Sequence, residues 1–150
     1  MTAAAKQLVK TDKDKALDLV DVASIEARRI DVSDPSLPQG LLAVANALLV
    51  LDAQRAWDAT FDAVKAANSA QGFTGEDGTL VYKFEGKENR SISTSTIEDF
   101  DVEGIFQKLA TKDYERAVEL ARGFQGEGPR AVATIAIARA ILEPKKVKEK

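Results

Sequence analysis

Apolar residues recur at helical spacing along most of the chain. Residues 12–29 place them on one face with acidic residues on the others, and the Asp12 side chain can accept the first free amides of a helix. Residues 52–68 show the same pattern behind Asp52. The pattern predicts two amphipathic helices. The apolar stripe of the first is formed by Ala16, Leu19, Val20 and Ala23, and in the second a single stripe is formed by Ala53, Trp57, Phe61, Val64 and Asn68.

The segment between these two helices, residues 37–51, is apolar almost all round. Pro35 and Pro38 suit the start of a helix rather than its middle. Because a helix that is apolar on every side needs neighbours on several sides, we expect this segment to be the centre of the core. Trp57, in the following helix, is interpreted as a core anchor rather than an exposed contact for a partner.

Helical spacing returns in the last third of the chain. Ser95 and Glu98 have the spacing of a capping box, in which each side chain bonds the other residue's backbone amide. Helices over 113–124 and 131–142 follow, and Pro144 ends the second. The capping box predicts a further helix ahead of these two, with an apolar stripe formed by Val102, Ile105, Phe106 and Leu109.

Residues 72–97 differ from the rest, because glycine, serine and threonine are frequent and the apolar positions alternate with a period of two. This pattern predicts strands over 79–85 and 90–94, joined near residues 86–89. The insertion is therefore expected to be a β-hairpin, and a plain long loop is the alternative. Helical folds do not need such a long excursion, and long insertions are often functional.

The two ends of the chain resemble each other. At an offset of 101 residues, an aspartate and the apolar positions around it match. At an offset of 91, Pro38 then matches Pro129, and the apolar helices that follow also match. Each copy would be a short helix, an Asp-capped helix, a turn marked by proline and an alanine-rich helix. A chance match of amphipathic helices is the alternative. The pairs at the first offset are Leu8 and Leu109, Asp12 and Asp113, Ala16 and Ala117, and Leu19 and Leu120.

Residues 113–121, with the sequence Asp-Tyr-Glu-Arg-Ala-Val-Glu-Leu-Ala, resemble a helix of tetratricopeptide and related HEAT-like α-solenoid repeats. The chain also looks similar to alanine-rich helical arrays of bacterial proteins. The resemblance implies a mainly all-α fold, with antiparallel helix pairs stacked as a short right-handed α-α superhelix. We expect one domain over 1–144, with the insertion at 72–97, and a basic disordered tail over 145–150.

Composition excludes several kinds of chemistry. The chain contains no cysteine and no histidine, which removes disulfides, thiolate metal sites and His-dependent catalytic triads. Its net charge is -3, and residues 145–150 contribute +3, so the rest of the chain carries -6. This balance argues against nucleic-acid binding, and none of the predicted helices is basic enough for a helix-turn-helix recognition helix.

The acidic and glycine-rich clusters have structural explanations. Residues 12–18 alternate acids as a calcium loop does, but Leu17 occupies the position that needs glycine. The acids at 98–103 could support acid-base chemistry or bind a hard metal, yet acids at a helix start also complement its dipole. The glycines at 123–128 lack the lysine of a phosphate-binding loop, and Arg122, Arg130 and Arg139 are spaced too loosely for an anion site. We therefore expect no catalytic residue, metal ligand or cofactor.

The sequence favours a non-catalytic protein-protein interaction or assembly scaffold that binds a protein or peptide. The hairpin is the expected contact, through the aromatic and basic residues Tyr82, Lys83, Phe84 and Arg90. The alternative is a helical pocket that binds a small ligand or performs carboxylate chemistry. Self-association is also expected to be feasible. Residues 1–10 show no secretion signal and no stretch is long enough to span a membrane, so the cytoplasm is the default location.

Overall fold

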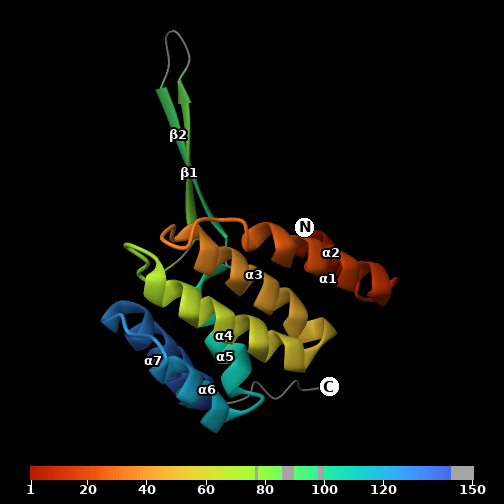
Figure 1. Ribbon diagram of the computed structural model, residues 1–150, viewed down its shortest axis with the longest axis vertical. Helices are drawn as coiled ribbons and strands as arrows, with labels where there is room; N and C mark the ends of the chain where they lie inside the picture. Colours follow the sequence, from red (N-terminus) through yellow and green to blue (C-terminus); the bar gives the residue numbers. More distant parts are fainter. Residues whose placement is uncertain (77, 86–89, 98–99, 143–150) are drawn as a thin grey trace.

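The computed structural model describes residues 1–76, 78–85, 90–97 and 100–142, and it describes residues 78–85 and 90–97 by their backbone alone. This part of the chain is mainly helical, as the apolar pattern predicted (Figure 1). None of its helices is both long and apolar enough to cross a membrane. Its seven α-helices are α1 (Thr2–Leu8), α2 (Lys13–Ala27), α3 (Ser36–Leu51), α4 (Ala53–Ser69), α5 (Val102–Ala110), α6 (Tyr114–Arg122) and α7 (Glu127–Leu142).

Four of the helices begin at an aspartate whose carboxylate accepts a backbone amide of the first turn. Asp12 accepts from Lys15 N at 3.1 Å, and Asp113 accepts from Arg116 N at 3.0 Å. Asp52 and Asp101 do the same for α4 and α5. These bonds satisfy amides that have no partner inside the helix, which explains why the helices start where they do.

The capping box predicted at Ser95 and Glu98 is wrong. Ser95 lies in strand β2 (Arg90–Ile97), which pairs antiparallel with β1 (Gly78–Glu85), while Glu98 lies outside the described residues. The ladder extends to the pair Gly78 and Ile97, so the chain is extended where the capping box required a helix start. The helix begins instead at Val102, behind Asp101.

The paired strands β1 and β2 project from the helical body (Figure 1). Gly78 pairs with Ile97 at one end and Glu85 with Arg90 at the other. The second strand is thus longer than the range predicted from the alternation, which ended at Thr94. In the sequence, the two strands lie between α4 and α5.

Helix α7 also begins earlier than predicted, at Glu127 instead of Ala131. Pro129 is its third residue, and Pro38 occupies the same place in α3. Proline is tolerated there because the amides of a first turn have no partner within the helix. The prolines therefore lie inside these helices and do not mark turns ahead of them.

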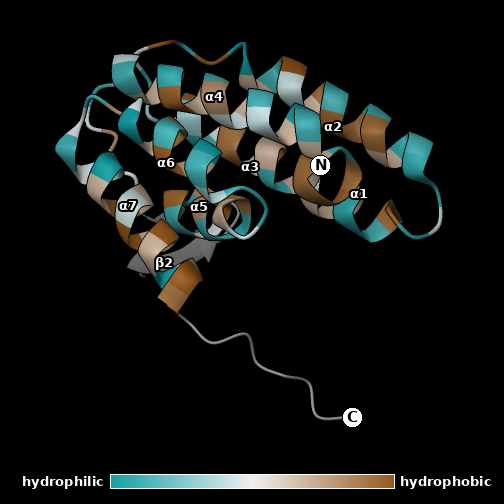
Figure 2. Cartoon of the chain, turned by 90° about the horizontal axis from the view of Figure 1, so that it is seen from below, coloured by the Kyte–Doolittle hydropathy of each residue, from teal (hydrophilic) through white to brown (hydrophobic). Residues whose placement is uncertain are grey.

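Helix α3 is the centre of the core, as predicted. Its residues from Leu41 to Leu51 are buried except for Val50, which is 61% exposed. It packs along α2 and α4 and also contacts α1 and α5 (Figure 1). Figure 2 shows α3 in the middle of the helical body, between α4 and α5.

A buried polar residue, Asn46, interrupts this apolar helix and holds the neighbouring helix α5 in position. Asn46 is 3% exposed, and its Oδ1 accepts a hydrogen bond from Lys108 Nζ of α5 at 2.7 Å. One turn on, Lys112 Nζ donates to the backbone oxygen of Leu49 at 3.2 Å. Because a buried amide without a partner is costly, these bonds favour one position of α5 against α3.

The segment between α4 and β1 packs closely against the start of α7 at a glycine. Gly75 is buried and has a φ of +78°, and a Cβ added there would lie 2.7 Å from the Cα of Pro129. Gly72 has a similar φ of +74° but no atom within 4 Å of that Cβ position. Both glycines have a backbone conformation that disfavours other residues, but only Gly75 is also closely packed. Substitutions at the two positions therefore separate these two effects on stability.

We predict that Gly72→Ala lowers the free energy of unfolding by about 1 kcal/mol, because alanine is strained at positive φ. Gly75→Ala should lower it by a further ~1–3 kcal/mol, because its methyl group clashes with Pro129 as well. Urea denaturation followed by circular dichroism measures both. Equal losses in the two variants would contradict the close contact between this segment and α7.

Candidate partner-binding groove

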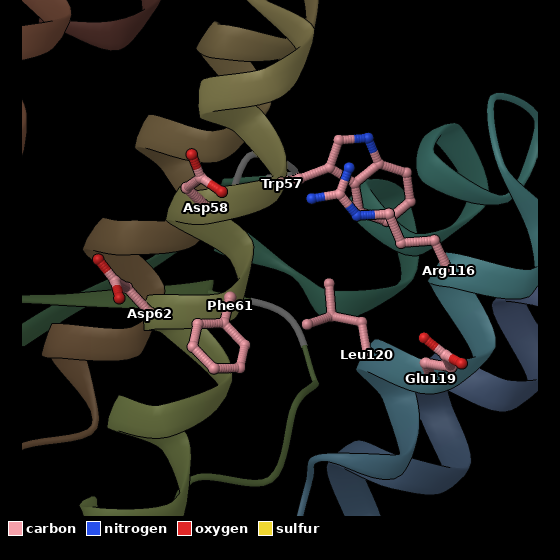
Figure 3. A pocket seen from close by; sticks show the side chains of 7 residues that line it. All are labelled: Trp57, Asp58, Phe61, Asp62, Arg116, Glu119 and Leu120. Carbon is pink, nitrogen blue, oxygen red and sulfur yellow. The ribbon is translucent and has the colours of Figure 1, made fainter.

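An open groove lies between α4 and α6 (Figure 3). Its volume is about 330 Å³. Helices α4 and α6 touch each other little, because α4 packs mainly on α3 while α6 packs on α5 and α7. The groove is therefore a seam between the first and last parts of the chain. It is lined by Trp57, Asp58, Phe61 and Asp62 of α4 and by Arg116, Glu119 and Leu120 of α6.

The floor of the groove is aromatic and aliphatic. Phe61 and the half-buried Leu120 face each other across it (Figure 3). Phe61 is 50% exposed although it shares its helix stripe with the buried Trp57 and Val64, because α6 stays apart from α4 at this level. Trp57 is 7% exposed and belongs to the core, which confirms the core-anchor interpretation.

Arg116 closes one end of the groove. Its guanidinium lies 4.6 Å from the centre of the Trp57 ring, a cation-π distance (Figure 3). Its Nη1 also donates to Gln54 Oε1 at 3.4 Å. The Asp113 cap helps to position this side chain, since it accepts the Arg116 backbone amide and sets the first turn of α6. One arginine thus joins the two helices and covers the tryptophan.

Asn68 fastens the other end. Its Nδ2 donates to the backbone oxygen of Gly123 at 2.8 Å, and its Oδ1 accepts the Gln125 amide at 2.8 Å. Both amide positions of the side chain are used, and the last turn of α4 is held against the turn between α6 and α7. With Arg116 at the opposite end, the separation of α4 and α6 is set at two points.

Carboxylates line both edges of the groove. Asp58 and Asp62 lie along α4, and Glu119 lies along α6 (Figure 3). Asp62 accepts Arg28 Nη2 of α2 at 2.6 Å. Lys65 places its Nζ 4.3 Å from the centre of the Phe61 ring. The site therefore combines apolar rings with charged edges.

Asp12, Lys15 and Asp31 have shifted pKa values. The hydrogen bond from the Lys15 side chain lowers the pKa of Asp12, and the same bond raises the pKa of Lys15. The hydroxyl of Ser33, followed by its backbone amide, lowers the pKa of Asp31. These pairs stabilise a helix start and a turn, so their shifts have local structural causes.

The residues predicted to contact a partner lie elsewhere. Tyr82, Lys83 and Phe84 are in β1 and Arg90 is in β2, and their side chains fall outside what the structure describes. None of them lines the α4/α6 groove. The groove residues escaped the sequence analysis because they come from helices that are far apart along the chain.

The acids at 98–103, weighed as a catalytic or metal-binding cluster, have structural roles where the structure describes them. Asp101 caps α5, and Glu103 accepts Arg139 Nη1 at 2.5 Å, while Glu98 and Asp99 lie outside the described residues. Within the described residues no three acids come close enough together to hold a metal ion. Asp12 caps α2 instead of forming a calcium loop.

A second groove, of about 450 Å³, separates α6 from α7. Ile141, 53% exposed, lies on its wall, and Leu142 is 80% exposed beside it. It has no aromatic ring covered by an arginine.

Comparison of the chain with protein-family models, with curated proteins and with solved structures found no match.

We predict that Arg116→Ala exposes Trp57 to solvent. The emission of this single tryptophan should shift to longer wavelength and be quenched more strongly by acrylamide, and the free energy of unfolding should fall by about 0.5–1 kcal/mol. Arg122→Ala, on the same helix but facing the second groove, is the control. Identical quenching of Trp57 in the two variants would contradict the stacked geometry.

Proposed function

We propose that this protein is a non-catalytic protein-binding module and that the α4/α6 groove binds a segment of its partner. The observation that carries the proposal is the half-exposed Phe61 facing Leu120, beside a tryptophan covered by Arg116. Apolar surface that stays exposed in a groove with polar edges is typical of sites that bind a partner. An apolar side chain of a partner would complete the burial of Phe61.

The free energy that a partner would gain by burying Phe61 is that of a specific interaction of moderate strength. Full burial of a phenylalanine side chain stabilises a complex by roughly 1.5–3 kcal/mol, and half of the Phe61 side chain is already covered. About 1 kcal/mol remains to be gained from this residue. Because the groove is fastened at Asn68 and at Arg116, little further ordering is needed on binding, which favours affinity.

The helices also support the proposed repeat arrangement, a short right-handed stack of helix pairs with the insertion at 72–97. Ala16 and Ala117, which the sequence offset aligns, are both fully buried, and so are Ala45 and Ala136. In each half a capped helix packs against a proline-marked one, α2 against α3 and α6 against α7. Solenoids of this kind bind partners along their surface grooves. Tyr82, Lys83, Phe84 and Arg90 would provide a second contact beyond the groove.

A small-ligand site is the second candidate. The groove volume of about 330 Å³ is at the lower end of the range for small-molecule pockets, and its lining mixes apolar and charged side chains. Its open shape between two helices suits an extended peptide better than an enclosed ligand. A peptide library and a fragment screen distinguish a peptide-binding groove from a small-ligand site.

We predict that panning a displayed dodecapeptide library against the intact protein enriches sequences that bind at this groove. Synthetic copies of the enriched peptides should change Trp57 fluorescence, and Phe61→Ala should weaken their binding about fivefold, equivalent to ~1 kcal/mol. Ile141→Ala, an equally exposed residue in the second groove, should leave the affinity unchanged.

Two results would contradict this proposal. One is a library that yields no peptide whose binding depends on Phe61. The other is an equal loss of affinity in Ile141→Ala, which would move the site to the α6/α7 groove. A fragment screen that finds small ligands competing at Trp57, without any peptide, would favour the small-ligand candidate.

A further inference from the structure

The cations around the α4/α6 groove are already engaged within the protein. Arg28 donates to Asp62 at 2.6 Å. Arg116 lies over the Trp57 ring, and the Lys65 ammonium lies over the Phe61 ring. Arg28 therefore neutralises Asp62, whereas Arg116 and Lys65 keep their positive charge while they lie against the faces of aromatic rings.

Two carboxylates at the groove form no ion pair with the described part of the chain. Asp58 accepts a weak hydrogen bond from Gln54 Nε2 at 3.4 Å and forms no ion pair with a described residue. Glu119 has neither a hydrogen bond nor an ion pair within the part of the chain that the structure describes. Both side chains are exposed, and they lie on opposite edges, Asp58 on α4 and Glu119 on α6 (Figure 3).

The residues that line the groove include three carboxylates and one arginine, so the lining is net negative, with acids on both sides of an apolar floor. A partner that places a carboxylate here would meet like charges, and a partner with a lysine or arginine would pair with Asp58 or Glu119. Exposed ion pairs contribute little to affinity, about 0–1 kcal/mol each, but they discriminate strongly between partners of opposite charge. The apolar floor provides affinity and the edges provide selection.

We propose, on the basis of the function proposed above, that the partner segment is cationic and amphipathic. An apolar side chain covers Phe61 and Leu120, and a lysine or arginine close to it in sequence pairs with Asp58 or Glu119. The chain's own residues 145–150 have this chemistry, with four lysines around Val147, so a peptide of residues 143–150 serves as one probe.

The test is a titration of Trp57 fluorescence with two synthetic decapeptides. The first alternates lysine with leucine and phenylalanine, and the second has glutamate in place of every lysine. Neither contains tryptophan, so the signal comes from the protein alone. We expect the lysine peptide to bind with lower Kd, and its Kd to rise when the salt concentration is raised from 50 to about 500 mM.

The variants assign the effect to the two carboxylates. Asp58→Asn and Glu119→Gln should each raise the Kd of the lysine peptide up to about fivefold and should lower that of the glutamate peptide. Glu115→Gln is the matched control, because Glu115 is exposed on α6 and does not line the groove. Circular dichroism confirms that all three variants retain their helices.

Each outcome distinguishes this inference from the proposed function. If both peptides bind equally and Phe61→Ala weakens both, the groove binds segments without regard to charge, and the inference is overturned while the function stands. An unchanged Kd in both carboxylate variants overturns it as well. If no peptide, including that of residues 143–150, responds to Phe61→Ala, the function fails together with it.

Discussion

A helix that is apolar on nearly every side must be covered by other helices. The arrangement of the described helices follows from this requirement, because α3 is such a helix. Its buried residues from Leu41 to Leu49 need α2 and α4 along its length, together with α1 and α5. The one buried amide, Asn46, then restricts α5 through its bond to Lys108. Once α5 is placed, α6 and α7 pack on it rather than on α3.

The groove is a consequence of this division. Helix α4 belongs to the cover of α3, and α6 belongs to the group around α5, so the two helices meet at the seam of two packing arrangements. Asn68 and Arg116 bridge the seam at its ends, and the middle stays open above Phe61 and Leu120. A surface formed in this way is fixed by the core beneath it, and that favours recognition of a partner without rearrangement.

Much of the helical architecture could be predicted from local chemistry. The aspartates at 12, 52 and 113 cap the helices they were expected to start, and the apolar run at 37–51 is the central helix. The prediction at Ser95 failed because the same residues also suit a strand, and pairing with β1 decides between the two. Local spacing does not carry that information.

The groove could not be predicted, because its residues have ordinary local roles. Phe61 lies at the spacing of a buried stripe, and its exposure depends on where α6 lies. Arg116 reads as a surface residue of an amphipathic helix until Trp57, far earlier in the chain, is placed beneath it.

The central claim is that recognition occurs at the seam between α4 and α6, and a chemical-shift map of the isotopically labelled protein with a selected peptide tests it most directly. The account predicts that the largest perturbations include the single indole signal of Trp57 and cluster at Phe61, Arg116 and Leu120. Perturbations that cluster instead on β1 and β2, or along the α6/α7 groove around Ile141, would contradict it.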